Sequence, residues 1–193
     1  VIVFPFDKDS ISVLATFQYQ NDSLISSDFT KRPKSAEETI LEDIYRNSLS
    51  AGMMYSEMSG VKNISYWIVI VKDEFGFTSY FLTKPLQGDI IPIGNDFKNN
   101  YNKKGKWKNF DNIHNNYIPI SINTPDDSEK ANKTFHTHSY PNTQFITATD
   151  ICILKLYSKK TKFKKHYVVS KKYISEYDLE KDELTIMTRE EFK

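Results

Sequence analysis

Residues 64–83, ISYWIVIVKDEFGFTSYFLT, decide the fold class because two strand-like runs flank a turn. Ile64 to Lys72 is an almost continuous run of β-branched and aromatic residues, and Phe77 to Thr83 is a second run of this kind. Asp73-Glu74-Phe75-Gly76 between them is typical of a turn, since aspartate and glycine adopt the backbone conformations that turns need. The stretch predicts a β-hairpin. Its first strand lacks clean alternation and is expected to be buried on both faces.

A helix is predicted immediately before this hairpin. Ser35-Ala36-Glu37-Glu38 is a capping box, in which the serine hydroxyl and the glutamate carboxylate satisfy each other's free backbone amides. Apolar residues then recur at helical spacing, which predicts an amphipathic helix that ends near Gly52 or a few residues later. Upstream, Val1 to Phe17 indicates one or two short strands, and residues 21–34 resemble a linker. We therefore expect an N-terminal extension over 1–34 and a domain over 35–193.

After the hairpin, the chain is expected to alternate between loops, short strands and one more helix. Residues 94–116 hold eight asparagines and show no hydrophobic period, so they predict an exposed loop, either a partner-binding insertion or a tolerated surface insertion. Thr147-Ala148-Thr149-Asp150 is a second capping box, with a helix behind it to about Lys160. Short strands are expected at the ranges 117–122, 133–138, 166–170, 173–177 and 184–187. This order predicts an α+β fold with a mixed, mainly antiparallel sheet flanked by helices.

Composition excludes several classes of protein. The 193 residues are 39% hydrophobic and 14% aromatic, enough for a core, and 26 basic against 25 acidic residues argue against a globally basic nucleic-acid binder. No apolar run approaches the roughly 18–20 residues that span a bilayer, so no membrane partner is expected. Cys152, the single cysteine, excludes an internal disulfide and a cysteine-rich zinc finger, and it is expected to be a small buried hydrophobe. The chain begins with Val1 and no signal-like segment follows, so we expect it to be part of something longer.

The segment from Phe135 to Asp150, FHTHSYPNTQFITATD, carries the chemistry. His136 and His138 on a strand point to the same face, because side chains alternate with a period of two. Two imidazoles in this arrangement can share one divalent ion, and Asp150 in the first turn of the following helix can swing back toward them. Alone, a His-x-His pair is commonly incidental and a Thr-x-x-Asp is commonly only a helix cap. Together they predict a two-histidine, one-carboxylate metal site with an open fourth position, as in catalytic zinc sites.

This segment resembles the JAMM motif of the JAB/MPN metalloprotease-like family, His-x-His-Pro, seven residues, then Ser-x-x-Asp. Ser139 stands in the proline position, Thr147 in the serine position and Asp150 in that of the third metal ligand. The resemblance covers roughly residues 36–178. It is closest to a bacterial branch found at the C-terminal ends of Rhs-type polymorphic toxins. The resemblance implies a zinc ion held by His136, His138 and Asp150, in a fold with cytidine-deaminase-like layering.

One departure from the family concerns the general base. The family places a glutamate just before the first buried strand, where this chain has Ser65, and a serine cannot take a proton from zinc-bound water. Glu57, eight residues earlier, either substitutes for that glutamate or is a solvated residue at the helix end. With a base present, the resemblance implies hydrolysis of an amide or isopeptide bond, in which Thr147 and the metal stabilise the oxyanion. Without a base, the domain keeps the metal and acts as a catalytically inactive binding module.

Further expectations concern partners and the remaining histidines. The resemblance implies a protein or peptide substrate, delivery into a target cell by a bacterial secretion system, and a cognate immunity protein. A lysine-rich stretch with interleaved aromatics follows Asp150 and leaves a metal-dependent nuclease as a competing interpretation. The simpler interpretation of this stretch is a solvated surface, and nucleic acid is not the expected partner. His114 and His166 have no partner at ligand spacing, so both are expected to be structural or exposed.

Overall fold

The computed structural model describes residues 2–3, 12–21, 23–86, 88–122, 133–139 and 143–192. The fold is α+β, as predicted, and the described strands pair in antiparallel fashion except for one parallel pair, β10 with β11. The chain divides into two compact units, residues 1–46 and 47–193, and the division lies inside α1 (Ala36–Met58), C-terminal to the predicted linker. The strands within the described residues form four separate sheets, where the sequence suggested one.

The first unit contains five short strands and the beginning of α1. Antiparallel pairs join β1 to β3, β3 to β4 and β2 to β5, so residues 21–34 contain two strands and are not simply a linker. The predicted cap of α1 is confirmed: Glu38 N–H donates to Ser35 Oγ at 3.2 Å, and Ser35 N–H donates to the Glu38 carboxylate at 2.7 Å. Arg32 donates to the same carboxylate from both terminal guanidinium nitrogens, Nη1 and Nη2. The strands are β1 (Ile2–Val3), β2 (Ser12–Val13), β3 (Ala15–Gln20), β4 (Ser23–Asp28) and β5 (Arg32–Pro33).

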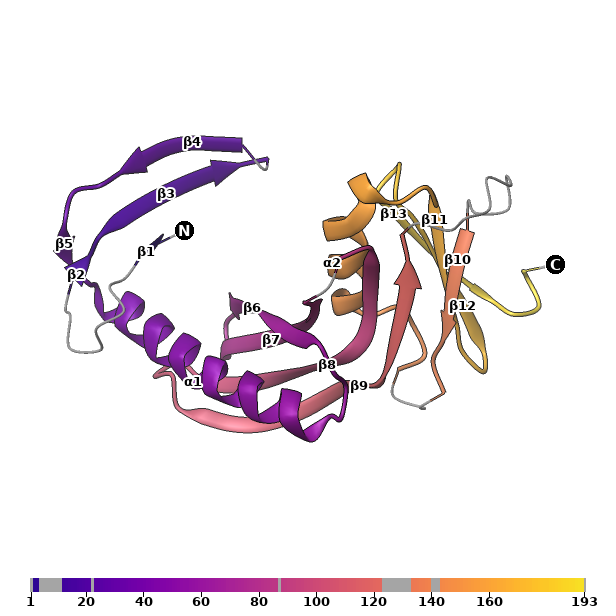
Figure 1. The fold of residues 1–193 in the computed structure, drawn as a ribbon, viewed down its shortest axis with the longest axis horizontal. Coiled ribbons are helices and arrows are strands. Elements are labelled where there is room, and N and C mark those ends of the chain that lie inside the picture. Colours follow the sequence, from indigo (N-terminus) through magenta and orange to yellow (C-terminus); the bar gives the residue numbers. More distant parts are fainter. Residues whose placement is uncertain are drawn as a thin grey trace. The chain divides into compact units, whose positions relative to one another are not determined.

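The second unit contains two four-stranded sheets, in the orders β6-β7-β8-β9 and β10-β11-β12-β13 (Figure 1). The predicted hairpin, the second helix and the late strands are all present. The elements are β6 (Ile64–Lys72), β7 (Gly76–Pro85), β8 (Ile90–Asn102), β9 (Trp107–Ser121), β10 (Lys133–Thr137), α2 (Ala148–Tyr157), η2 (Ser158–Lys160), β11 (Lys165–Val169), β12 (Tyr173–Asp178) and β13 (Glu183–Thr188).

The expected loop over residues 94–116 is wrong, because this segment forms most of the long β8–β9 hairpin. The hydrophobic period fails here since polar side chains occupy the interior of the ladder: Asn99 and Asp96 are buried on β8. Polar side chains of this hairpin pair with one another along and across the strands. Asn100, for example, donates to Asp111 on β9 at 2.8 Å and accepts from Thr78 on β7 at 3.1 Å. Strands built in this way carry no apolar alternation for a sequence analysis to find.

Two apolar groups hold the second unit together. Phe81 and Phe97 stack at 4.0 Å between ring centroids, and Tyr55 of α1 packs on Phe97 at 4.1 Å. The larger core centres on α2, which Figure 1 shows beside β8, and it joins residues of both sheets. Burying each of its leucines and isoleucines contributes about 1.5–3 kcal/mol. Its buried members are Leu82, Ile91, Ile93, Ile146, Ile153, Leu154, Phe163, Val168 and Tyr177.

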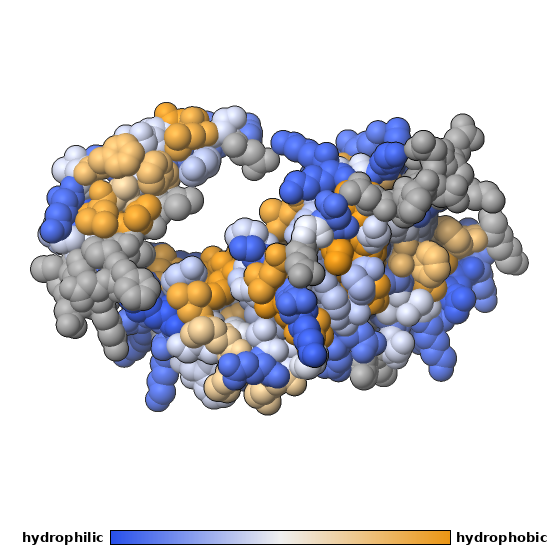
Figure 2. Space-filling view, in the orientation of Figure 1, coloured by the Kyte–Doolittle hydropathy of each residue, from blue (hydrophilic) through white to orange (hydrophobic). Residues whose placement is uncertain are grey.

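Strand β6 is an edge strand, and the expectation that it is buried on both faces is wrong. Trp67, Val69 and Val71 alternate along it and are 40–47% exposed. The continuous apolar run therefore reflects β propensity and an exposed apolar face. Figure 2 shows hydrophobic residues interspersed with hydrophilic ones on the visible side of the molecule. Among the residues that the structure describes, no helix is both long and apolar enough to cross a membrane.

Candidate metal centre

His136 and His138 lie on the same side at the end of β10, as their spacing predicted. Strand β10 pairs in parallel with β11, which places His136 opposite Val168. The pairing continues one step beyond the strand, because His138 N–H donates to the carbonyl oxygen of Val169 at 3.0 Å. Both rings are buried, with exposed fractions of 5% and 6%. Backbone pairing with β11 therefore holds the two imidazoles in place before any ligand binds.

Asp150 reaches the same point from the first turn of α2. Its Oδ2 accepts from Thr147 N–H at 2.9 Å and from Thr147 Oγ1 at 2.8 Å, while Asp150 N–H donates back to Thr147 Oγ1 at 3.2 Å. The predicted capping box is thus confirmed. Oδ1 is different: among the described residues, it is the one fully buried side-chain oxygen or nitrogen without a hydrogen-bond partner. An orphaned buried carboxylate oxygen is costly unless a cation fills the space in front of it.

His114 on β9 is the fourth member of the cluster, although the sequence shows no partner for it at ligand spacing and we expected it to be structural or exposed. The ladder places His114 opposite Asp96 of β8, and its Nδ1 lies 2.6 Å from the Asp96 carboxylate. The strand register shifts between Gly94 and Asp96, where the backbone φ angles of Gly94 and Asn95 are positive. Such bulges bend a strand and re-aim its side chains. The same bulge therefore sets where Asp96 and His114 lie.

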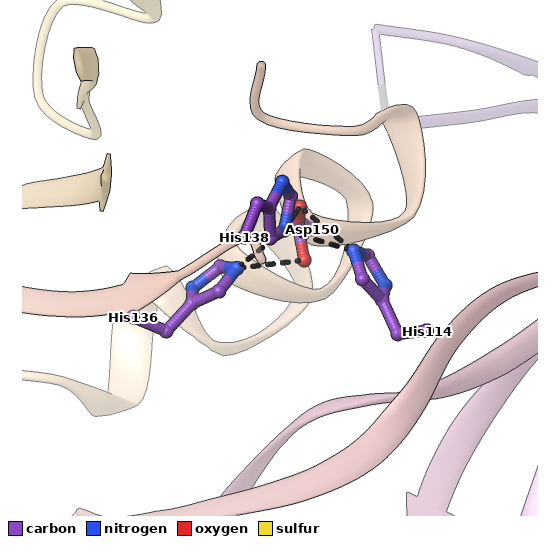
Figure 3. A group of neighbouring side chains, drawn as sticks. All are labelled: His114, His136, His138 and Asp150. Atoms are coloured by element: carbon purple, nitrogen blue, oxygen red, sulfur yellow. Dashed lines mark hydrogen bonds and ion pairs between the residues drawn. The ribbon is translucent and has the colours of Figure 1, made fainter. Parts of the chain in front are cut away.

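The four side chains converge on one position, as Figure 3 shows. His138 Nε2 lies 2.9 Å from the Nε2 atoms of both His114 and His136. Asp150 oxygens lie 3.7–3.8 Å from the same three nitrogens, and one ligand atom from each residue lies within 4.8 Å of all the others. Tetrahedral zinc with bonds near 2.05 Å spaces its ligand atoms roughly 3.3 Å apart. The residues present therefore fit a single metal ion.

Proton positions strengthen this fit. His138 Nδ1 faces the carbonyl oxygen of Phe145 at 3.0 Å, and a carbonyl can only accept, so Nδ1 carries the hydrogen. Its Nε2 is then a bare lone pair in the neutral ring. His114 is fixed in the same way, because its Nδ1 faces a carboxylate. When both rings are neutral, the two Nε2 lone pairs 2.9 Å apart repel each other, and a metal ion between them turns that repulsion into ligation.

Burial and neighbouring charge shift the pKa values of these rings in different directions. Burial lowers the pKa of His136 to about 3 and also lowers the pKa of His138, so both rings are neutral and ready to bind metal near pH 7. Burial has the same tendency at His114, but the hydrogen bond and charge of Asp96 outweigh it and raise the pKa of His114. Neutral imidazole is the form that ligates metal ions.

A small pocket of about 90 Å³ opens onto the cluster from the histidine side. His114, His136 and His138 line it, whereas Asp150 is not among the lining residues. The other lining residues are uncharged: Ile93, Gly94, Asn115, Asn116, Ile118, Thr137, Ser139 and Thr143. A small neutral group in this pocket would meet the three imidazoles directly.

Two other predicted site residues lie differently from the three ligands. Thr147 is beside the cluster, but its hydroxyl is committed to Asp150 and to the helix cap. Glu57 is exposed in the last turn of α1 and is not one of the four grouped side chains. Ser65 is on β6, opposite Lys84 of β7. The structure thus brings together the three predicted ligands and Thr147, but not Glu57.

Sequence reasoning missed His114, Asp96 and the partner of His136. That partner is His166, a fully buried residue of β11 whose Nε2 lies 2.8 Å from His136 Nδ1. All four histidines of the chain therefore belong to one connected group. Their scarcity was the available signal, since a chain with four histidines and a His-x-His pair leaves few other nitrogen ligands.

The chain matches no protein-family model, and no curated protein or solved structure shows significant similarity to it.

Proposed function

We propose that residues 47–193 form a zinc-dependent hydrolase domain that cleaves an amide or isopeptide bond, the activity implied by the resemblance to the JAB/MPN family. One observation carries the proposal. Three imidazole nitrogens line a pocket, and a buried carboxylate with an unpaired oxygen approaches the same point. A site of this kind is accessible to a small substrate group on the side of its neutral ligands.

The donor atoms favour zinc in a catalytic role. Imidazole nitrogen suits zinc, copper, iron and nickel, and carboxylate oxygen completes common zinc sites. Structural zinc sites mostly use cysteine thiolates, whereas catalytic sites use histidine and carboxylate ligands. The cluster contains no thiolate. Hydrolysis needs no change of oxidation state, which makes zinc the simplest metal for the proposed reaction.

The chain's own residues would perform the supporting tasks. A bound zinc ion would supply Lewis-acid chemistry, activating water near neutral pH and polarising a carbonyl group. Thr147 would hold Asp150 in place through Oδ2 and leave Oδ1 for the metal. The uncharged side chains around the pocket would admit a neutral peptide-like group. Asp96 would orient His114 through its Nδ1.

A second candidate is a catalytically inactive metal-binding module. This function is favoured by the count of ligands, since four protein donors fill the tetrahedral coordination that zinc prefers in structural sites. The exposure of Glu57 favours it too, because a general base must lie within hydrogen-bond reach of the proton it takes. Both candidate functions require bound metal, but only the hydrolase should turn over a substrate.

Hydrolysis of matched peptide- and isopeptide-linked substrates by the purified chain tests the proposal. We expect activity that EDTA removes and zinc restores, and that His138→Ala abolishes. Lys133→Ala, an exposed change on the same strand, is the control and should retain activity. Zinc binding without any turnover on either substrate would favour the inactive module. Activity that survives both EDTA and His138→Ala would contradict the proposal.

The biological setting implied by the resemblance is that of a toxic effector domain with a cognate immunity protein. Expression of the chain in a bacterial host should then arrest growth, and His136→Ala should relieve the arrest. Harmless expression of the wild-type chain without any partner would count against this setting. The nuclease interpretation is less favoured, because several lysines of the basic stretch are paired with acids: Lys155 with Asp182, Lys164 with Glu180 and Lys165 with Glu176.

A further inference from the structure

We infer that His166 and Thr134 form a buried relay that keeps the proton of His136 on Nδ1 and so presents Nε2 to the metal. The inference rests on metal binding by the cluster, as proposed above, and not on the bond that is cleaved. Both residues act through His136 and are positioning residues. Neither is one of the four grouped ligands.

The relay runs between two adjacent parallel strands. The register places Thr134 of β10 opposite His166 of β11, two residues before the pair of His136 and Val168. His136 Nδ1 lies 2.8 Å from His166 Nε2, and His166 Nδ1 lies 2.8 Å from Thr134 Oγ1. His166 is fully buried, with 0% of its surface exposed. The three polar side chains form a continuous chain of hydrogen bonds that ends at the metal position.

His136 needs such a relay because its Nδ1 faces another ring. The Nδ1 atoms of His114 and His138 face a carboxylate and a carbonyl, which only accept hydrogen bonds, so their tautomers are fixed. The ring of His166 can either donate from Nε2 or accept there. If it donates, the proton of His136 moves to Nε2 and the lone pair needed for a metal is lost.

A hydroxyl can donate or accept, so Thr134 permits either arrangement, and a metal at His136 Nε2 requires the one in which Thr134 Oγ1 accepts. When Thr134 Oγ1 accepts from His166 Nδ1–H, His166 Nε2 is an acceptor, His136 Nδ1 donates to it, and His136 Nε2 is free to ligate. When the hydroxyl is removed, His166 Nδ1–H has no partner at this position. The ring then favours the other tautomer, which donates from Nε2 to His136. Loss of the Thr134 hydroxyl should therefore weaken metal ligation by His136, two residues away in the sequence.

Two pairs of variants test the relay. Thr134→Val removes the hydroxyl and keeps the shape, and Thr134→Ser restores a hydroxyl. His166→Leu removes the acceptor at Nε2, and His166→Gln restores an amide oxygen near that position. Partners of metal-bound histidines typically contribute roughly 10–100-fold to metal affinity. We expect this loss of zinc affinity for the valine and leucine variants, measured by competition with a chelating indicator, and a loss of less than about threefold for serine and glutamine.

A second measurement reads the tautomer directly. In ¹⁵N-histidine spectra of the metal-free chain, the fraction of His136 that carries its proton on Nδ1 should be larger in wild type than in Thr134→Val. The Nε2–H population should rise correspondingly in the variant. Unfolding temperatures of the metal-free variants show whether packing has changed, and Thr134→Val carries the test if His166→Leu does not fold.

The outcomes separate this inference from the proposed function. An equal Nδ1–H fraction of His136 in metal-free wild type and Thr134→Val, or unchanged zinc affinity in both Thr134→Val and His166→Leu, would overturn the relay. A chain that binds zinc with the expected variant effects but hydrolyses nothing would overturn the proposed activity and leave the relay standing. If the wild-type chain bound no metal, the proposed function would fail, and the tautomer spectra would still decide whether the relay exists.

Discussion

Replacing His114 offers the sharpest test of the proposed four-ligand site, because its two ring nitrogens make different contacts. Nδ1 donates to buried Asp96, and Nε2 faces His138. In His114→Asn, the side-chain amide can still donate to Asp96 but offers no nitrogen lone pair to a metal. In His114→Ala both interactions are lost. The two variants therefore separate ligation from packing.

The expected effects differ in kind. Residues that hydrogen-bond to a metal-bound histidine contribute roughly 10–100-fold to metal affinity, so the loss of a ligand itself should cost at least about 100-fold. Zinc at about 100 times its Kd stabilises wild type by ~2.7 kcal/mol, and after a hundredfold loss of affinity the same zinc gives only ~0.4 kcal/mol. For a unit of this size these energies correspond to Tm increases of roughly 5–10 °C and about 1 °C. His114→Ala should also lower the metal-free stability by about 1–3 kcal/mol, since it strands the buried Asp96 carboxylate.

Thermal unfolding with and without zinc, together with indicator competition, measures both quantities. We expect His114→Asn to match wild type without metal and to lose most of the zinc-dependent shift. A full zinc-dependent shift in His114→Asn would show that His114 is not a ligand. The site would then reduce to the two histidines and one carboxylate that the sequence predicts.

Three further predictions concern charge, strain and pH. Asp150→Asn should abolish zinc binding in indicator competition, because a neutral amide replaces the carboxylate that approaches the three histidines. Gly94→Ala should lower the unfolding free energy by about 2 kcal/mol or more in denaturant titration, since its φ is +78° and a Cβ would lie 2.2 Å from a carbonyl oxygen of β9. Gly60→Ala is the matched control: φ is +69° but the space is open, so the loss should stay near ~1 kcal/mol. Glu38, whose pKa the Arg32 hydrogen bond lowers from 4.5 to about 2, should stabilise the first unit above pH 4.5 by about 1 kcal/mol. That stability should be lost as the pH falls toward 2, and Arg32→Gln should remove most of this dependence in acid unfolding curves.

Local signals predicted much of this fold, and the reason is physical. Both capping boxes and the β6–β7 hairpin are encoded within a few neighbouring residues, so their sequence patterns were sufficient. His136, His138 and Asp150 were predictable for the same reason, because a strand period and a helix start fix them locally. Confirmed elements of this kind need no knowledge of the distant chain.

The rest depends on pairing between distant segments. His114 reaches the cluster through the β8–β9 register and the bulge beside Gly94, neither of which leaves a mark in the polar sequence around it. His166 reaches His136 because β10 and β11 pair in parallel across a helix. The strands of the asparagine-rich hairpin could not be predicted, because amide side chains stand where most strands have apolar ones. The membership of the family stays a prediction.

The capping box of α2 couples the metal position to the backbone of a helix. Asp150 Oδ2 accepts from the Thr147 amide and hydroxyl and also lies 3.7–3.8 Å from His138 and His114, while Oδ1 lies 3.7 Å from His136. An ion drawn to this carboxylate would therefore also slow the fraying of the first helical turn. Deuterium uptake at the Asp150 and Ile151 amides should consequently report the loading of the site, with no substrate needed, in any sample that can be digested for mass spectrometry.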